Sequence, residues 1–293
     1  MRGVDFFVRE HLREQIAERE VLDVFFGACS SGRATLSSAT RALASEIQRL
    51  PGPVSILSLM RGGAAVGAAV ANICEEDGAP IRHGLLGWVR GEPSAVRASG
   101  IHESSAVVVA VDGWTGSGST LREFRARWQG PPLVTAALAD PAMVCDIAGT
   151  TRDVLVPHAL LGPASAMGLG RVHRAASGEL RAYRRSPGIT LANYSTAVLG
   201  APSTPSTEDA PSPLRLPKLP QLEDRSAVRY GVNECWRAYV RGELAELMVS
   251  ANARQVDEQS LAPLIDRLGD RWYFGDTGVY QCIGFVALAE SPH

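Results

Sequence analysis

The stretch SAVVVAVDGWTGSGST, residues 105–120, constrains the fold more than any other part of the chain. Residues 106–111 are all apolar, Asp112 follows them, and a turn of Gly, Ser and Thr comes next. An apolar run that does not alternate with polar residues is typical of a strand buried on both faces, as in parallel sheets covered by helices. Because ligands of such sheets collect beyond the carboxyl ends of the strands, the stretch predicts an α/β protein with a site near Asp112.

The remaining patterns agree with this fold class. Apolar runs predict further strands, and helical periodicity predicts helices between them. The strands are expected over residues 53–60, 82–90, 133–139 and 152–158, and the helices over 35–50, 64–77 and 121–128. This alternation predicts a parallel-sheet, Rossmann-like α/β domain. A mixed tail follows, with helices predicted over 233–243 and 260–269 and strands within 244–253 and 283–289.

A Pro- and Ser-rich segment divides the chain. Residues 199–224 lack the apolar periodicity that could bury a face, and we expect a linker there. The sequence therefore predicts one domain over residues 1–198 and a second over residues 225–293.

Charge and cysteine content narrow the class of protein. The formal net charge is −2, so the whole chain shows no bias toward nucleic acid or anionic membranes. The 5 cysteines form no CxxC, which argues against a disulfide framework or a zinc site. The first 20 residues carry charges throughout, unlike a signal peptide, and the apolar runs are too short to span a membrane. We expect a cytoplasmic protein without a membrane partner, and the sequence leaves a homodimer open.

The turn after Asp112 has the composition of a phosphate-binding loop. Glycines allow main-chain amides to approach a ligand, hydroxyls add donors, and a following helix brings its positive end. A carboxylate beside such a loop can accept hydrogen bonds from sugar hydroxyls. The pattern therefore favours a sugar phosphate, although an ordinary strand-to-helix turn has the same composition.

The same residues resemble the phosphoribosyl-diphosphate signature of type I phosphoribosyltransferases. The resemblance implies that Asp112 holds the ribose, with Mg²⁺ bound indirectly through the diphosphate. It implies that the 5′-phosphate is bound by the loop residues Thr115, Gly116, Ser117, Gly118, Ser119 and Thr120. Gly113 departs from the signature, which has a second acidic residue at this position.

A second loop supports the resemblance. Arg61, Gly62 and Gly63 follow a predicted strand, where these transferases bind pyrophosphate. The resemblance further implies a mobile lid that contains Arg90 and Arg97, and an acceptor site near Asp140. The expected activity is transfer of phosphoribose from phosphoribosyl diphosphate to an unidentified small acceptor, with Asp112 and Arg61 as the catalytic residues. Arg152 and Asp153 are equally compatible with a structural ion pair.

Several segments together resemble the StiP-type proteins of bacterial tellurite-resistance and stress gene clusters. They are DGWTGSG, ALADPA, TTRDVLVPHALL and GVNE. That family has been labelled a cysteine protease, which makes a thiol protease an alternative function. Cys29 and Cys145 are the candidate thiols, and no histidine partner is evident in the sequence for either of them.

The tail resembles pelota-type domains that bind kinked RNA. Gly231, Asn233, Glu234 and Arg237 match that signature, which implies that these residues contact RNA. Residues 221–293 carry 7 Arg and 11 acidic residues, 7 − 11 = −4, whereas RNA-binding modules are usually basic. Packing against the first domain is the alternative role. The missing acid at Gly113 leaves one more alternative, an RNA-binding regulator that senses phosphoribosyl diphosphate without reacting.

Overall fold

The computed structural model describes residues 19–30, 32–59, 62–79, 81–86, 105–160, 173–174, 180–181, 199, 228–252 and 255–286. The chain forms two compact units. One consists of residues 33–151 and 161–208, and the other of residues 1–32, 152–160 and 209–293. We refer to them as the sheet unit and the C-terminal unit.

The sheet unit contains a parallel five-stranded sheet in the order β2-β1-β3-β4-β5. Its strands are β1 (Val54–Leu59), β2 (Ile81–Leu86), β3 (Val107–Trp114), β4 (Leu133–Ala139) and β5 (Ile147–Thr150). The first five residues of β3 are all buried, as the unbroken apolar run predicts. The predicted parallel-sheet α/β fold is therefore confirmed.

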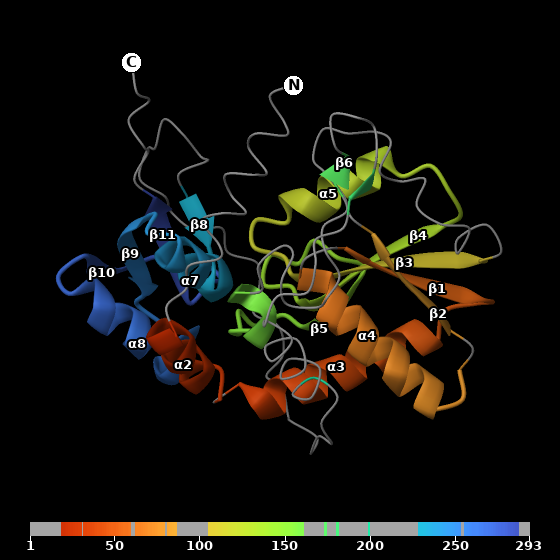
Figure 1. Cartoon of the computed structure of the whole chain (residues 1–293), viewed down its shortest axis with the longest axis horizontal. Helices are drawn as coiled ribbons and strands as arrows, with labels where there is room; N and C mark the ends of the chain where they lie inside the picture. The colour runs from red at the N-terminus through yellow and green to blue at the C-terminus, as the bar shows by residue number, and fades with distance from the viewer. Residues whose placement is uncertain are drawn as a thin grey trace. The chain divides into compact units, whose positions relative to one another are not determined.

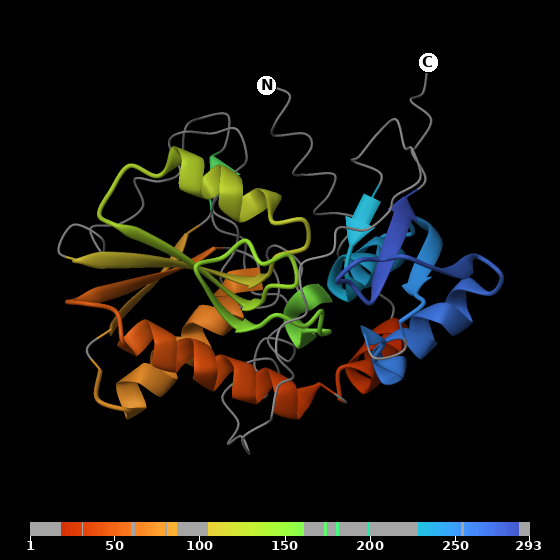
Figure 2. The ribbon, with the colours of Figure 1, turned by 180° about the vertical axis from the view of Figure 1, so that it is seen from behind.

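Helices cover both faces of this sheet (Figures 1 and 2). Helices α3 (Arg33–Gln48) and α4 (Gly62–Glu76) lie along one face, and α5 (Ser119–Arg127) lies over the other. Leu121 and Phe124 of α5 pack on Leu59, Leu86 and Ala110 from three neighbouring strands. A two-stranded ribbon, β6 (His173–Arg174) with β7 (Leu180–Arg181), completes the described elements.

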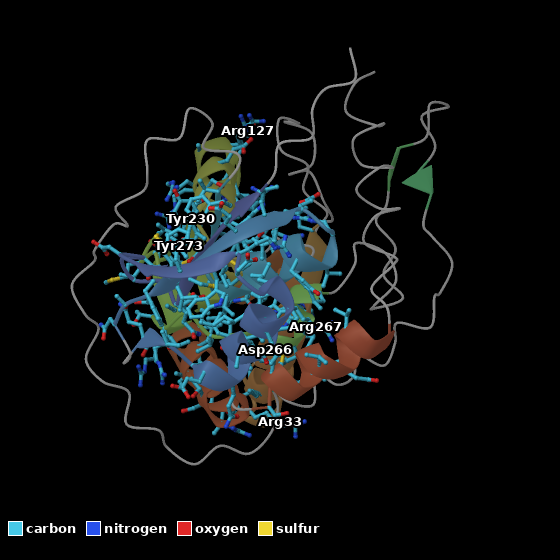
Figure 3. All side chains as sticks on the ribbon, turned by 90° about the vertical axis from the view of Figure 1, so that its left-hand side faces the viewer. Arg33, Arg127, Tyr230, Asp266, Arg267 and Tyr273 are labelled. Atoms are coloured by element: carbon cyan, nitrogen blue, oxygen red, sulfur yellow. The ribbon has the colours of Figure 1, made fainter. Side chains whose placement is uncertain are left out.

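The C-terminal unit is built on a mixed four-stranded sheet in the order β10-β9-β11-β8. Its strands are β8 (Val228–Tyr230), β9 (Leu244–Ser250), β10 (Trp272–Gly275) and β11 (Cys282–Val286). The helices are α7 (Val232–Val240), α8 (Glu258–Leu268) and α2 (Arg19–Ala28). Figure 3 labels Tyr230 on β8, Tyr273 on β10, and Asp266 and Arg267 on α8.

The segment 152–160 belongs to the C-terminal unit, although it directly follows β5 in the chain. The sequence predicts a strand over 152–158, and this prediction is wrong. Residues 153–156 form no regular element, and η2 (Pro157–Leu160) is a 3₁₀ helix. The apolar side chains Val154, Leu155 and Val156 are nevertheless buried. The unit boundaries therefore differ from the predicted division into residues 1–198 and 225–293. Of the predicted linker over 199–224, only residue 199 is among the described residues.

Candidate functional site

The candidate site lies where the strand order changes direction. The chain passes from β1 through α4 outward to β2, and then returns to β3 on the other side of β1. The carboxyl ends of β1 and β3 therefore flank a topological switch point, where open α/β sheets bind ligands. Gly62, just after β1, and Asp112, near the end of β3, meet at this point. A Cβ atom on Gly62 would lie 3.0 Å from Asp112 Oδ1.

The start of α4 approaches β3 so closely that only glycine fits. A Cβ atom on Gly63 would lie 2.0 Å from the carbonyl oxygen of Val111. The sequence predicts that Gly62 and Gly63 admit a diphosphate to the main chain. The structure shows another reason for a glycine at position 63, because α4 and β3 are in direct contact there.

The loop between β3 and α5 is held by its own main chain and by one arginine. Gly116 and Gly118 both have positive φ, 35° and 72°. The Arg122 guanidinium donates from Nη2 to the carbonyl oxygen of Ser117 at 2.6 Å. Arg122 N donates to Gly118 O at 3.1 Å, so the loop leads directly into the first turn of α5. Helix first turns present N–H groups that have no intrahelical acceptor, and these groups attract negative charge.

Asp140 braces this loop from the end of β4. Its carboxylate accepts from Thr115 Oγ1 at 2.6 Å through Oδ1, and from Cys145 N at 2.8 Å through Oδ2. The side chain is only 1% exposed. Asp140 was predicted to lie at an acceptor site, but in the structure both carboxylate oxygens already hold the neighbouring loops.

Cys145 carries the thiol of this site. It is half-buried and packs against the cluster formed by α5 and strands β1 to β3. Burial raises its pKa well above the usual range, and the negative charges of Asp140 and Asp112 raise this pKa further. At neutral pH the thiol is therefore protonated. The hydrogen bonds of Asp140 to Cys145 N and to Thr115 place Cys145 beside the loop that follows β3.

The other cysteines are buried. Cys29, Cys74, Cys235 and Cys282 are each at most 1% exposed, so Cys145 is the most accessible of the five thiols. Burial is also the main reason why the pKa of Cys74 is raised. The sequence names Cys29 and Cys145 as candidate thiols, and accessibility favours Cys145.

Two predicted groups cannot be placed. Arg61 of the predicted pyrophosphate loop, and Arg90 and Arg97 of the predicted lid, lie outside the described residues. Arg122 was missed, although an arginine three residues into the helix after a Gly/Ser loop is a recognisable signal. Within the described ranges, His, Cys, Asp and Glu form no cluster of three that could ligate a metal ion.

The predicted RNA-contact residues have structural partners. The Asn233 side chain is buried, accepts from Val156 N at 2.8 Å and donates to Val154 O at 2.8 Å. Glu234 pairs with Arg237 at 2.9 Å. A Cβ on Gly231, which has a φ of 84°, would lie 2.8 Å from Asp153 Oδ1. The motif therefore holds the segment 153–156 inside the C-terminal unit.

Comparison with known proteins gives a family. The profile of the family described as "Tellurite-like stress resistance cysteine protease StiP" matches residues 6–176. The protein named cysteine protease StiP from Acinetobacter baylyi is 26% identical over 151 residues, covering 48% of this chain and 39% of that protein. The chain thus spans about two-fifths of the length of this relative.

Solved structures with a similar fold include phosphoribosyltransferases, each aligned with 40% of this chain. A purine phosphoribosyltransferase from Pyrococcus horikoshii is 22% identical, with 81% of that chain covered and a TM-score of 0.29. An enzyme described as HGPRT-ase from Leishmania tarentolae, in complex with GMP, is 18% identical, with 75% covered and a TM-score of 0.30. Similarity at this level does not indicate a function.

The predicted phosphoribosyl transfer is contradicted by these matches. Both the family profile and the curated relative carry the description of a cysteine protease, and both indicate an enzyme. The sequence signature led to a wrong prediction for two reasons. Glycines and hydroxyls after a buried strand also suit an ordinary strand-to-helix turn. In the other loop, Gly63 is required because α4 packs closely on β3. Among the described helices, none is long and apolar enough to cross a membrane.

Proposed function

The chain belongs to the StiP family, and we propose that it is a cysteine protease whose nucleophile is the thiol of Cys145. One observation carries the choice of residue. Cys145 is the one cysteine that is not buried, and Asp140 joins its main chain to Thr115 in the glycine-rich loop after β3. This is the edge at which α/β proteins bind their substrates.

The surroundings of the thiol define its chemistry. A thiol that is protonated at neutral pH attacks only if a base removes its proton as the bond to the carbonyl carbon forms. The carboxylates of Asp140, Asp112 and Asp146 act on Cys145. Both oxygens of Asp140 hold the loops, and Asp146 pairs with Arg125. Asp112, whose Oδ1 accepts from Gly113 N at 2.7 Å, is therefore the proposed proton acceptor.

The first turn of α5 is the proposed site for the developing negative charge. Attack on a carbonyl group moves charge onto its oxygen, and helix N–H groups stabilise such an oxyanion. Val144, next to Cys145, contacts the loop, since a Cβ on Gly118 would lie 2.6 Å from Val144 Cγ2. Cys145 itself packs against the cluster that contains Leu121 and Phe124 of α5.

His158 does not fit the role of base. It is fully buried in the C-terminal unit, and burial lowers its pKa to about 3. Among the remaining described histidines, His83 shares a hydrogen bond of 2.8 Å with Ser58. Because neither His158 nor His83 suits the role, the proposal assigns proton transfer from the thiol to a carboxylate and not to an imidazole.

Thiol alkylation tests the proposal. Iodoacetamide should abolish hydrolysis of a mixed fluorogenic peptide library, and mass spectrometry should locate the modification at Cys145. Cys145→Ser should lose hydrolysis by about two orders of magnitude or more. Cys74→Ser, which changes a buried cysteine of the same unit, is the matched control and should retain activity.

The same loop supports a second candidate function, binding of a phosphorylated small molecule such as phosphoribosyl diphosphate without transfer. The observation that favours it is Arg122, whose guanidinium lies against the loop at the helix end. Asp112 offers a single carboxylate, so Mg²⁺ would have to arrive with the diphosphate, which supplies the other oxygens. Calorimetric titration with phosphoribosyl diphosphate and Mg²⁺ should give binding that Arg122→Ala weakens, and no heat of binding would reject this function.

A pelota-like role for the C-terminal unit, with RNA as a partner, also stays a proposal. Glu234 and Arg237 on α7 are its remaining contact candidates, because their side chains are partly exposed whereas Asn233 is buried. Filter binding with a kinked RNA duplex tests it. Loss of binding in Arg237→Ala would support the role. If the wild-type protein retained a straight RNA duplex on the filter as well as the kinked one, the result would argue against it.

A further inference from the structure

Two buried cysteines meet inside the C-terminal unit. Cys235 lies in α7 and Cys282 is the first residue of β11, and both side chains are fully buried. The main chain joins them through Gly231, whose N–H donates to Cys282 O at 3.0 Å. Cys235 N in turn donates to Gly231 O at 3.1 Å. The two cysteines are 47 positions apart in the sequence. Two main-chain hydrogen bonds that share Gly231 therefore connect their backbones.

The Cys235 side chain lies over the strand that carries Cys282. A Cβ atom on Gly284 would lie 3.1 Å from Cys235 Sγ. Gly284 follows Cys282 by two positions on the same strand, so the Cys282 side chain leaves the same face of the sheet. Cys235 therefore lies over the row that Cys282 begins. Cys235 Sγ donates to the carbonyl oxygen of Arg229, on the strand paired with β11, at 3.7 Å. Burial, and then the neighbouring Cys235 and Asp153, raise the pKa of Cys282.

We propose that Cys235 and Cys282 form a reversible dithiol–disulfide pair, a modification site separate from Cys145. A peroxide is the oxidant. One thiol releases its proton and attacks a peroxide oxygen as the thiolate, which breaks the O–O bond and gives a sulfenic acid and hydroxide. The hydroxide takes up the released proton and becomes water. The second thiol then attacks the sulfenic acid sulfur, and a second water leaves as the S–S bond forms. Two thiols lose two protons and two electrons, and hydrogen peroxide becomes two molecules of water. A dithiol reductant reverses the step.

The bond would stabilise the clamp on the segment 153–156. Gln281, next to Cys282, donates its N–H to Asp153 Oδ2 at 2.9 Å. Val232, in the same helix as Cys235, donates its N–H to that oxygen at 3.1 Å. A link between Cys235 and Cys282 therefore ties together the two elements that hold Asp153. Because both thiols are buried and the pKa of Cys282 is raised, oxidation should be slow.

Peptide mapping of the full chain tests the pair. The native protein is treated with hydrogen peroxide, denatured in N-ethylmaleimide and digested without reductant. We expect a linked peptide pair that contains Cys235 and Cys282, and that dithiothreitol separates. We also expect the thermal midpoint of the oxidised protein to rise by several degrees.

Matched variants identify the partners. Cys74→Ser changes a buried cysteine of the sheet unit and should retain the link, whereas Cys235→Ser should abolish it and leave the reactivity of Cys145 unchanged. Recovery of both Cys235 and Cys282 as maleimide adducts after prolonged peroxide treatment would overturn the proposal. So would a link from either residue to a different cysteine. Both outcomes are read in the wild-type chain, so they do not depend on how well a variant folds.

Discussion

The Asn233 amide binds the backbone of a neighbouring segment. Its pattern with Gly231 and Glu234 predicts contact with RNA, but the side chain is buried and bonded to the backbone of Val154 and Val156. An RNA base would have to displace both hydrogen bonds. The structural role follows from a contact 77 positions away in sequence, which no local pattern reveals.

We predict that Asn233→Ala lowers the free energy of unfolding by about 2–4 kcal/mol, because a buried donor and acceptor lose their partner. Glu234→Ala, which breaks a partly exposed ion pair on the same helix, should cost about 1 kcal/mol or less. Urea denaturation followed by tryptophan fluorescence measures both values. Equal effects of the two substitutions would mean that the amide does not brace the segment 153–156.

Asp153 gives a prediction of pH dependence. The sequence allows an ion pair with Arg152, but its carboxylate accepts backbone N–H groups of Val232 and Gln281. Burial raises its pKa from 3.8 to about 6. The folded state therefore binds a proton more tightly than the unfolded chain does. This contribution to stability is fully present below the unfolded pKa of 3.8, and it is lost as the pH rises through the folded pKa of about 6.

The free energy of unfolding should accordingly fall by about 3 kcal/mol from this group between roughly pH 4 and pH 7. Asp153→Asn cannot titrate and should remove that part of the slope, while its amide oxygen can still accept a hydrogen bond. Urea denaturation across this range compares the two proteins. Parallel stability curves for wild type and variant would show that Asp153 does not titrate in the folded state.

At the level of elements, the approach of α4 to β3 fixes the switch point. Gly63→Ala places a methyl group against the Val111 carbonyl, which belongs to the backbone and cannot rotate away. We predict a loss of about 3 kcal/mol in the free energy of unfolding, at the upper end of overpacking effects. Gly27→Ala, at a helical position with open space, should be neutral or stabilise by about 0.5–1 kcal/mol. Similar values for both variants in denaturant titrations would contradict the close approach.

Sequence patterns predict the elements that bury an apolar face within one unit. The run at β4 was predicted with its observed bounds, and α4 within two residues. Short edge strands such as β8 and β10 were missed because three or four residues show no period. The segment 152–158 was mistaken for a strand because its apolar residues pack into the other unit, without sheet partners.

The site was predictable only in part. Asp112 and the turn 115–120 stand out because a buried strand ends in polar and flexible residues. The accessibility of Cys145 and the use of both Asp140 oxygens depend on how two loops meet after folding. The chemistry of the site depends on those contacts, and a loop that suits phosphate in composition does not identify a phosphoribosyl transfer.

For the whole molecule, the two units are interleaved in sequence. Residues 152–160 fold with residues 209–293, so a division near a linker at 199–224 cuts through a unit. We predict that a chain ending at Glu208 leaves Val154, Leu155 and Val156 without their partners and binds a hydrophobic dye strongly. The full chain should not. A truncated chain that remains monomeric and binds no dye would show that Val154, Leu155 and Val156 do not need residues 209–293 to stay buried.

The assignment of the family's thiol chemistry to Cys145 is tested most directly by peptide hydrolysis as a function of pH, comparing wild type with Cys145→Ser. Burial and the neighbouring carboxylates raise the pKa of Cys145, so its thiolate population increases as the pH rises from neutral into the alkaline range. A thiolate attacks without transferring a proton to Asp112, so the rate should increase with that population. Hydrolysis that increases in this way in wild type and is absent in the variant is the predicted result. Hydrolysis of equal rate in the variant would contradict the assignment.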